Sequence, residues 1–180
     1  LYFMPRKEIK RRTEELLEFC DLIKFRKRTV RKLSGGMKRK LMVCRALLTD
    51  PEILLLDEPT AGMDALSRRQ MWNLLRKLNG KNLTILLTTH YMEEAQNLCS
   101  RVALMDHGKL EEVNTPAGLI DSLGNYTVDE FAGDETHSHY FHSREEAIAY
   151  LSGLSGQASL RETTLEDVFV ERAGRHLMPS

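Results

Sequence analysis

Two carboxylates and one imidazole follow apolar runs in this sequence. The run 53–56 is followed directly by Asp57 and Glu58, and the run 83–87 leads through two threonines to His90. A carboxylate at a strand end suits Mg²⁺, which prefers oxygen ligands and keeps several waters. The neighbouring carboxylate is suited to orient or deprotonate a water that attacks a phosphate. The histidine is suited to donate a hydrogen bond to a developing phosphate charge. Each feature alone is more typical of a solvated turn or a structural histidine.

A serine and two glycines offer a second set of phosphate contacts. Ser34, Gly35 and Gly36 stand directly before an apparent helix. Glycines allow the backbone to approach a ligand closely, and the exposed N–H groups of a helix start favour phosphate oxygens. Taken alone, an ordinary serine-capped helix is the preferred interpretation of these residues.

Apolar spacing predicts the elements that must position these groups. Apolar residues at helical spacing predict four helices. The first begins at Pro5, the second follows Gly36 and ends before Asp50-Pro51, and the others cover residues 67–78 and 91–98. A strand is predicted at 53–56, which is apolar throughout, as in a parallel strand buried on both faces. A second apolar strand is predicted at 83–87. Residues 102–105 and 110–113 predict a hairpin. Because strands and helices alternate, we expect an α/β layer with its site at the carboxyl ends of the strands.

The character of the sequence changes after Pro116. Strands at 126–131, 139–142 and 158–161, with a helix at 144–151, predict a small α+β extension. Thr163 and Glu166 have the spacing of a capping box before a final helix. Three nearby histidines, at 137, 139 and 142, suggest a metal site, but an exposed polar edge is the preferred interpretation.

Composition limits the classes of partner. The 180-residue chain has a formal net charge of zero and a pI of about 7.2, so no nucleic-acid partner is expected. Cys20, Cys44 and Cys99 are odd in number and far apart, which indicates a reducing cytoplasm and thiols that pack as small apolar side chains. No apolar run approaches the ~20 residues needed to span a bilayer, so any membrane contact is expected through a partner.

Three motifs together resemble the ATP-binding-cassette (ABC) ATPases. LSGGMKRK at 33–40, ILLLDEPTAGMDA at 53–65 and TILLTTHYMEEA at 84–95 resemble the signature motif, the Walker B motif with its D-loop, and the switch-histidine region, in the family's order. The resemblance runs from Leu1 to about Gly118. It implies a P-loop NTPase-like core with a mostly parallel sheet and a helical signature subdomain, followed by the α+β extension.

The resemblance also implies roles for individual residues. Asp57 would hold Mg²⁺ through water, Glu58 would be the general base for ATP hydrolysis, and His90 would contact the γ-phosphate. Ser34, Gly35 and Gly36 would bind the γ-phosphate of ATP held by a second subunit, and Asp64 of the D-loop would communicate across the dimer. The implied cofactors are ATP and Mg²⁺. The implied partners are a second ATPase subunit, as a homodimer, and an integral-membrane permease that keeps the protein at the cytoplasmic face of the cell membrane.

Some positions depart from the common pattern. Met37 replaces a frequent Gln, which removes an amide that is able to contact nucleotide, and Met63 replaces the usual Leu of the D-loop. The signature followed by basic residues, together with THYMEEA, resembles the exporter subfamily that handles drugs, polysaccharides or lipids.

The phosphate-cradling motif GxxxxGK[ST] does not occur in the sequence. We therefore expect a C-terminal fragment with little ATPase activity alone. Its expected parts are the ATPase portion 1–125, with a helical subdomain at about 1–50 and the Walker B to switch region at about 51–118, and the extension 126–180. Two alternatives stay open, a soluble ABC ATPase acting on ribosomes or DNA and a non-enzymatic interaction module.

Overall fold

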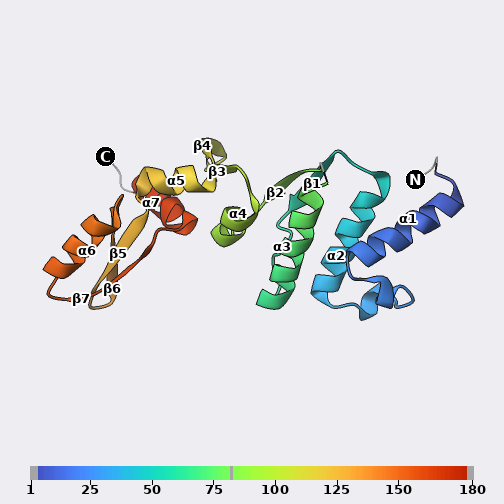
Figure 1. Ribbon diagram of the computed structural model, residues 1–180, viewed down its shortest axis with the longest axis horizontal. Helices are drawn as coiled ribbons and strands as arrows, with labels where there is room; N and C mark the ends of the chain where they lie inside the picture. The colour runs from blue at the N-terminus through green and yellow to red at the C-terminus, as the bar shows by residue number, and fades with distance from the viewer. Residues whose placement is uncertain (1–3, 82, 178–180) are drawn as a thin grey trace. The chain divides into compact units, whose positions relative to one another are not determined.

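The computed structural model describes residues 4–81 and 83–177, with the backbone alone for 173–177. Its contacts form two compact units, the first ending at His90 and the second beginning at Tyr91 (Figure 1). The predicted boundary near residue 125 falls inside the second unit. The division into domains at that point stays a prediction.

Three helices form most of the first unit. They are α1 (Arg6–Phe19), α2 (Gly35–Ala46) and α3 (Ala65–Asn79), with short 3-10 turns at Ile23–Phe25, Val30–Lys32 and Leu47–Thr49. The Ser34 side chain caps α2 by accepting from the Met37 amide at 3.3 Å, and Asp64 caps α3 in the same way. In Figure 1, α1 crosses α2, and α3 runs beside α2. The buried hydrophobic residues of α2, of α3 and of the position that follows α1 are Cys20, Val43, Cys44, Met71, Trp72, Leu74, Leu75 and Leu78.

Two parallel strands complete this unit. β1 (Ile53–Asp57) pairs with β2 (Thr84–Thr88), and the register sets Asp57 opposite Thr88. The parallel pairing agrees with the sequence, but the expectation of burial on both faces is wrong. Leu54 is 4% exposed, whereas Leu55 is 70% exposed, because no described residue of this unit covers the face that carries Leu55.

The second unit begins with a helix and a hairpin. Helix α4 (Met92–Leu98) precedes β3 (Val102–Asp106) and β4 (Lys109–Asn114), which pair antiparallel as predicted. Gly108 has a φ of +76°, which suits the tight turn between the two strands. Helices α5 (Pro116–Leu123) and α7 (Leu165–Leu177) pack with α4 and the hairpin. The core of this packing consists of Ala95, Val102, Leu104, Leu119, Leu165 and Val168.

A three-stranded antiparallel sheet forms the rest of the second unit. Its strands are β5 (Tyr126–Ala132), β6 (Glu135–Phe141) and β7 (Gln157–Glu162), in the order β6-β5-β7. Helix α6 (Arg144–Gly153) packs on all three strands and begins with a capping box of Ser143 and Glu146. Val128 in the central strand and Ala147 on the helix are fully buried at this contact.

The predicted cap of the last helix is wrong by one residue. The Thr163 hydroxyl is buried and shares a 2.8 Å hydrogen bond with the Thr127 hydroxyl, so it does not cap α7. Instead the Thr164 amide donates to Asp167 Oδ2 at 2.7 Å, and α7 begins at Leu165. Because Thr163 bonds Thr127, the neighbouring Thr164 takes the capping position of α7.

One arginine joins two carboxylates beside this helix start. Arg161 Nε donates to Asp129 Oδ2 at 2.6 Å, and its Nη2 donates to Asp167 Oδ1 at 2.7 Å. Burial alone would raise the pKa of both carboxyl groups. Hydrogen bonds from Arg161, together with those from Ser138 and Thr164, outweigh this effect, and each pKa lies below its ordinary value.

We expect Arg161→Met to destabilise the protein by about 2 kcal/mol at neutral pH. The substitution leaves two carboxylates, each with a 12% exposed side chain, without their cation. The cost is below that of a fully buried pair because 37% of the Arg161 side chain is exposed. The pKa values of Asp129 and Asp167 are lowered in the folded wild type. The difference in the free energy of unfolding between wild type and variant should therefore be complete above pH ~4, the ordinary pKa of a carboxyl group, and should fade as the pH falls through the two lowered pKa values.

Urea unfolding of both proteins at a series of pH values measures this difference. Arg144→Met is the matched control, because Arg144 is exposed at the start of α6 and should leave the unfolding midpoint unchanged. An equal loss for both variants would contradict the role of the Arg161 pairs.

The described residues contain no helix both long enough and apolar enough to cross a membrane.

Candidate functional site

The carboxyl ends of β1 and β2 bring polar groups together. The Thr88 hydroxyl donates a short hydrogen bond to Asp57 Oδ1. The backbone N–H of Glu58 donates to the Thr88 carbonyl oxygen at 3.0 Å, which extends the parallel ladder by one residue. Because parallel strands end at the same edge, Asp57 and the residues after β2 share one small region.

Glu58 turns the chain toward the next strand end. Its φ is +43°, an uncommon value for a residue other than glycine, and such backbone conformations are concentrated at functional sites. Its carboxylate oxygen Oε1 lies 3.0 Å from Nδ1 of His90. The side chains of His90 and Glu58 are 56% and 47% exposed, so solvent reaches both groups. The structure thus brings Asp57, Glu58 and His90 to one accessible edge of the sheet.

The contact with Glu58 favours one form of the imidazole. A carboxylate only accepts hydrogen bonds, so the proton is favoured on Nδ1 of His90, which then donates to Glu58 Oε1. Glu58 in turn keeps its other carboxylate oxygen available to accept a proton or a hydrogen bond from water. This arrangement is that of a base oriented by a neighbouring group.

The donor set at Asp57 suits a hydrated Mg²⁺ ion. The site offers oxygen ligands only, from the Asp57 carboxylate and the Thr88 hydroxyl, and Asp57 is exposed. Mg²⁺ held here would supply positive charge to a phosphate group beside Glu58. The described residues, those at this edge included, contain no group of three or more His, Cys, Asp or Glu side chains able to hold a metal ion by themselves.

The serine and the two glycines lie at the exposed start of α2. Ser34 and Gly35 are exposed, and an added Cβ at Gly35 would meet no atom within 4 Å. A Cβ at Gly36 would lie 3.0 Å from the Ser67 hydroxyl oxygen, so glycine permits close approach of α2 to the start of α3. Ser34 accepts from the Met37 N–H, so the N–H groups of Gly35 and Gly36 are the ones at this helix start that an external anion is able to bind.

Asp64 has a structural role at the start of α3. Its Oδ1 accepts from the Ser67 amide at 2.8 Å, and its Oδ2 accepts from the Ser67 hydroxyl at 2.7 Å. The hydrogen bonds from the Ser67 side chain and backbone lower the pKa of Asp64 below its ordinary value. The same Ser67 faces Gly36, so Asp64 and the serine–diglycine start are linked through one side chain.

Sequence reasoning assigned no site role to two residues at this edge. Thr88 bonds Asp57 directly, and it could have been found from the parallel register that sets it opposite Asp57. Arg39 of α2 reaches the Glu58 carbonyl oxygen at 3.5 Å, a long contact that no sequence pattern indicated.

The chain is similar to known ATP-binding proteins of ABC transporters, both in sequence and in fold. Residues 4–61 match the ABC transporter family. The chain is 40% identical to "Nod factor export ATP-binding protein I" of Cupriavidus pinatubonensis, over 94% of this chain and 58% of that protein. It is 37% identical to the protein of the same name in a Rhizobium species, over 98% of this chain and 65% of that protein. The chain thus spans about three fifths of the length of these relatives.

Solved structures of ATP-binding cassettes have a similar fold. The cbiO1 protein of Clostridium perfringens, part of the ABC transporter complex cbiONQ, has a TM-score of 0.61 at 26% identity, over 64% of this chain and 47% of its own. The ADP conformation of the cassette MJ1267 has a TM-score of 0.62 at 21% identity, over 84% of this chain and 52% of its own. The fold is therefore that of the ABC ATPases.

Proposed function

The chain belongs to the ATP-binding subunits of ABC transporters, and we propose that the intact protein hydrolyses ATP with Glu58 as the general base. The observation that carries the proposal is the 3.0 Å contact between Glu58 Oε1 and His90 Nδ1, next to the Asp57–Thr88 pair. It supports one site at which a base, its orienting group and a magnesium ligand lie together.

Each side chain has one task in this proposal. Glu58 accepts a proton from the attacking water, and His90 holds the Glu58 carboxylate in place through Nδ1–H. When it is doubly protonated, His90 also donates from Nε2 toward the phosphate on which charge develops. Asp57, aligned by Thr88, binds Mg²⁺ through water. Solvent reaches Glu58 and His90, which suits a site completed by another molecule.

We assign the exposed serine–diglycine start to the site of a second subunit. Ser34 and Gly35 are exposed at the start of α2, where backbone N–H groups favour phosphate oxygens. If each ATP lies between the carboxylates of one subunit and the helix start of the other, the dimer is symmetric, because each subunit gives both halves. Asp64, linked to Gly36 through Ser67, would relay the partner's position to the α3 start.

Export is the proposed direction of transport. The relatives are export ATP-binding proteins, and the cbiO1 protein belongs to a transporter complex. By the same relationship the partner is an integral-membrane permease, which would keep the protein at the cytoplasmic face of the membrane. The alternative, action on ribosomes or DNA, has no support in the sequence charge, which is balanced overall.

The experiment uses the intact protein expressed together with its permease. We expect phosphate release from ATP with Mg²⁺, its loss when EDTA removes the metal, and recovery of the protein in the membrane fraction. Absence of phosphate release with Mg²⁺ present would contradict the enzymatic proposal, and co-sedimentation with ribosomes instead of membranes would contradict the transporter assignment.

A further inference from the structure

Two cysteines far apart in the sequence meet inside the first unit. Cys20 lies at the end of α1 and Cys44 lies in α2, and the two residues are 1% and 4% exposed. The Cys44 thiol donates to the Leu16 carbonyl oxygen at 3.2 Å, and the same oxygen accepts from the Cys20 amide at 3.0 Å. The Cys44 sulfur therefore lies within two hydrogen-bond lengths of the Cys20 backbone.

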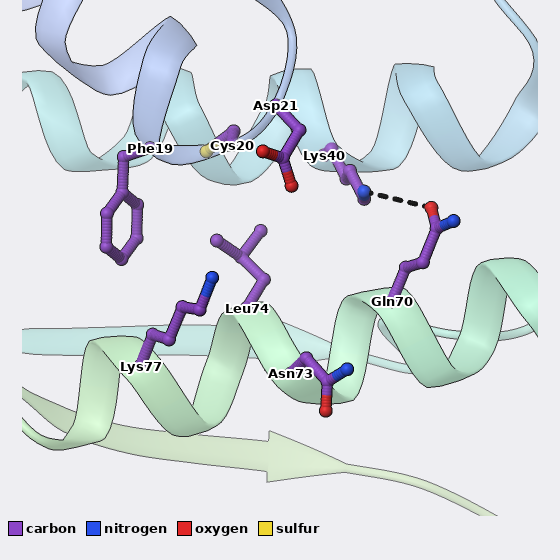
Figure 2. A pocket seen from close by; sticks show the side chains of 8 residues that line it. All are labelled: Phe19, Cys20, Asp21, Lys40, Gln70, Asn73, Leu74 and Lys77. Carbon is purple, nitrogen blue, oxygen red and sulfur yellow. Dashed lines mark hydrogen bonds between the residues drawn. The ribbon is translucent and has the colours of Figure 1, made fainter.

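A small cavity is lined by one of these two cysteines. It has a volume of about 120 Å³ and lies between the end of α1, α2 and α3. Cys20 lines this cavity and Cys44 does not. Figure 2 shows Cys20 and Asp21 on one side, Lys40 behind, and the Lys77 side chain extending from α3 toward the end of α1. Since one water occupies ~30 Å³ of liquid, the cavity has room for a reagent as small as hydrogen peroxide.

The charges of the cavity favour a thiolate at Cys20. Lys40 is 9% exposed, and its one described hydrogen-bond partner is a neutral group, Gln70 Oε1 at 3.1 Å. Two lysines, Lys40 and Lys77, face one carboxylate, Asp21, around this cavity. A thiolate at Cys20 would supply a second negative charge. The charge of the buried Lys40 therefore favours the thiolate form of Cys20.

The two thiols also differ in acidity. The neighbouring Cys44 side chain and the charge of Lys40 hold the pKa of Cys20 below its ordinary value, although burial and the charge of Asp21 oppose them. The neighbouring Cys20 side chain, together with burial, raises the pKa of Cys44 above its ordinary value. Since the thiolate is the nucleophile, Cys20 reacts first and Cys44 follows.

We propose that Cys20 and Cys44 are an oxidation site, at which a peroxide entering the cavity oxidises Cys20 and Cys44 then closes a disulfide between α1 and α2. In the first step the Cys20 sulfur bonds to one peroxide oxygen, the O–O bond breaks, and hydroxide leaves and is protonated to water. In the second step the Cys44 sulfur attacks the sulfenic sulfur, and the hydroxyl leaves as water with the Cys44 proton. Two thiols are oxidised and one peroxide is reduced to two waters.

The reduced chain, treated with hydrogen peroxide at neutral pH, tests this proposal. We expect a monomer that has lost two hydrogen atoms, and non-reducing peptide mapping should join the peptides of Cys20 and Cys44. Cys99 lies in the second unit at the end of α4, and it should stay reduced while the disulfide forms. Cys99→Ser should give the same product at the same rate.

Two further variants separate the roles of the thiols. In Cys44→Ser, we expect Cys20 to accumulate as a sulfenic acid that dimedone traps. In Cys20→Ser, we expect the peroxide reaction of Cys44 to be slower by about tenfold or more, the effect of one pKa unit on the thiolate fraction. Wild type that loses Cys99 before Cys20, or that ends with oxidised Cys20 and a free Cys44, would overturn the proposal. The wild-type result is decisive even if a variant fails to fold.

Discussion

Glu58→Gln in the intact protein should lower ATP turnover by about 10²- to 10⁴-fold, the usual contribution of a positioned general base. Glutamine has nearly the same shape and keeps an oxygen that is able to accept from His90 Nδ1, but it is unable to take a proton from water. Binding of ATP should change little, because the lost interaction belongs to the reaction step. The effect should therefore appear in kcat and not in the nucleotide affinity.

Phosphate-release kinetics and equilibrium binding of a fluorescent ATP analogue measure the two quantities separately. Glu52→Gln is the matched control, because Glu52 is an exposed glutamate just before β1, at the end of the strand away from Glu58. It should retain wild-type turnover. A Glu58→Gln protein with more than a tenth of wild-type kcat would rule out Glu58 as the base.

Gly35→Asp should abolish turnover while leaving the fold intact. An added Cβ at Gly35 meets no atom within 4 Å, and a carboxylate is favourable in the first turn of a helix such as α2. If the start of α2 faces the triphosphate of a second subunit, the new carboxylate repels it. Like charges placed together cost several kcal/mol, so we expect a loss of about 100-fold or more.

Thermal unfolding and phosphate release together separate this effect from misfolding. The unfolding temperature of Gly35→Asp should match that of wild type, and Gly35→Ala, which adds a side chain without charge, should retain most of the turnover. Near-normal turnover in Gly35→Asp would mean that the α2 start does not meet a phosphate.

The strand-end chemistry could be predicted because it depends on local sequence. An apolar run that ends in Asp57-Glu58 indicates where a strand stops, and the parallel pairing of β1 with β2 then brings His90 to the same edge. The backbone turn at Glu58, with its positive φ, has no signature in the residue type. Its direction could be learned only from the folded chain.

Long-range contacts account for what sequence reasoning missed. The cap of α7 moved from Thr163 to Thr164 because Thr163 bonds Thr127, 36 residues earlier. The sequence predicts that Cys20 and Cys44 pack as small apolar side chains, yet the packing of α1 on α2 brings the Cys44 thiol to the same carbonyl oxygen that accepts from the Cys20 amide. Leu55 is exposed because no described residue of the first unit covers its face of the sheet, and the sequence of the strand alone does not show whether that face is covered.

Mixing two inactive forms of the intact protein, Glu58→Gln and Gly35→Asp, tests most directly whether the site is shared between subunits. In a mixed dimer, the Glu58 of one subunit meets the unaltered Gly35 of the other, so one of the two sites is intact. With random mixing, half of the dimers are of this kind, and phosphate release should recover to roughly a quarter of wild type. If the carboxylates and the helix start serve the same subunit, mixing restores nothing, and activity that stays at the level of the separate variants would contradict the account.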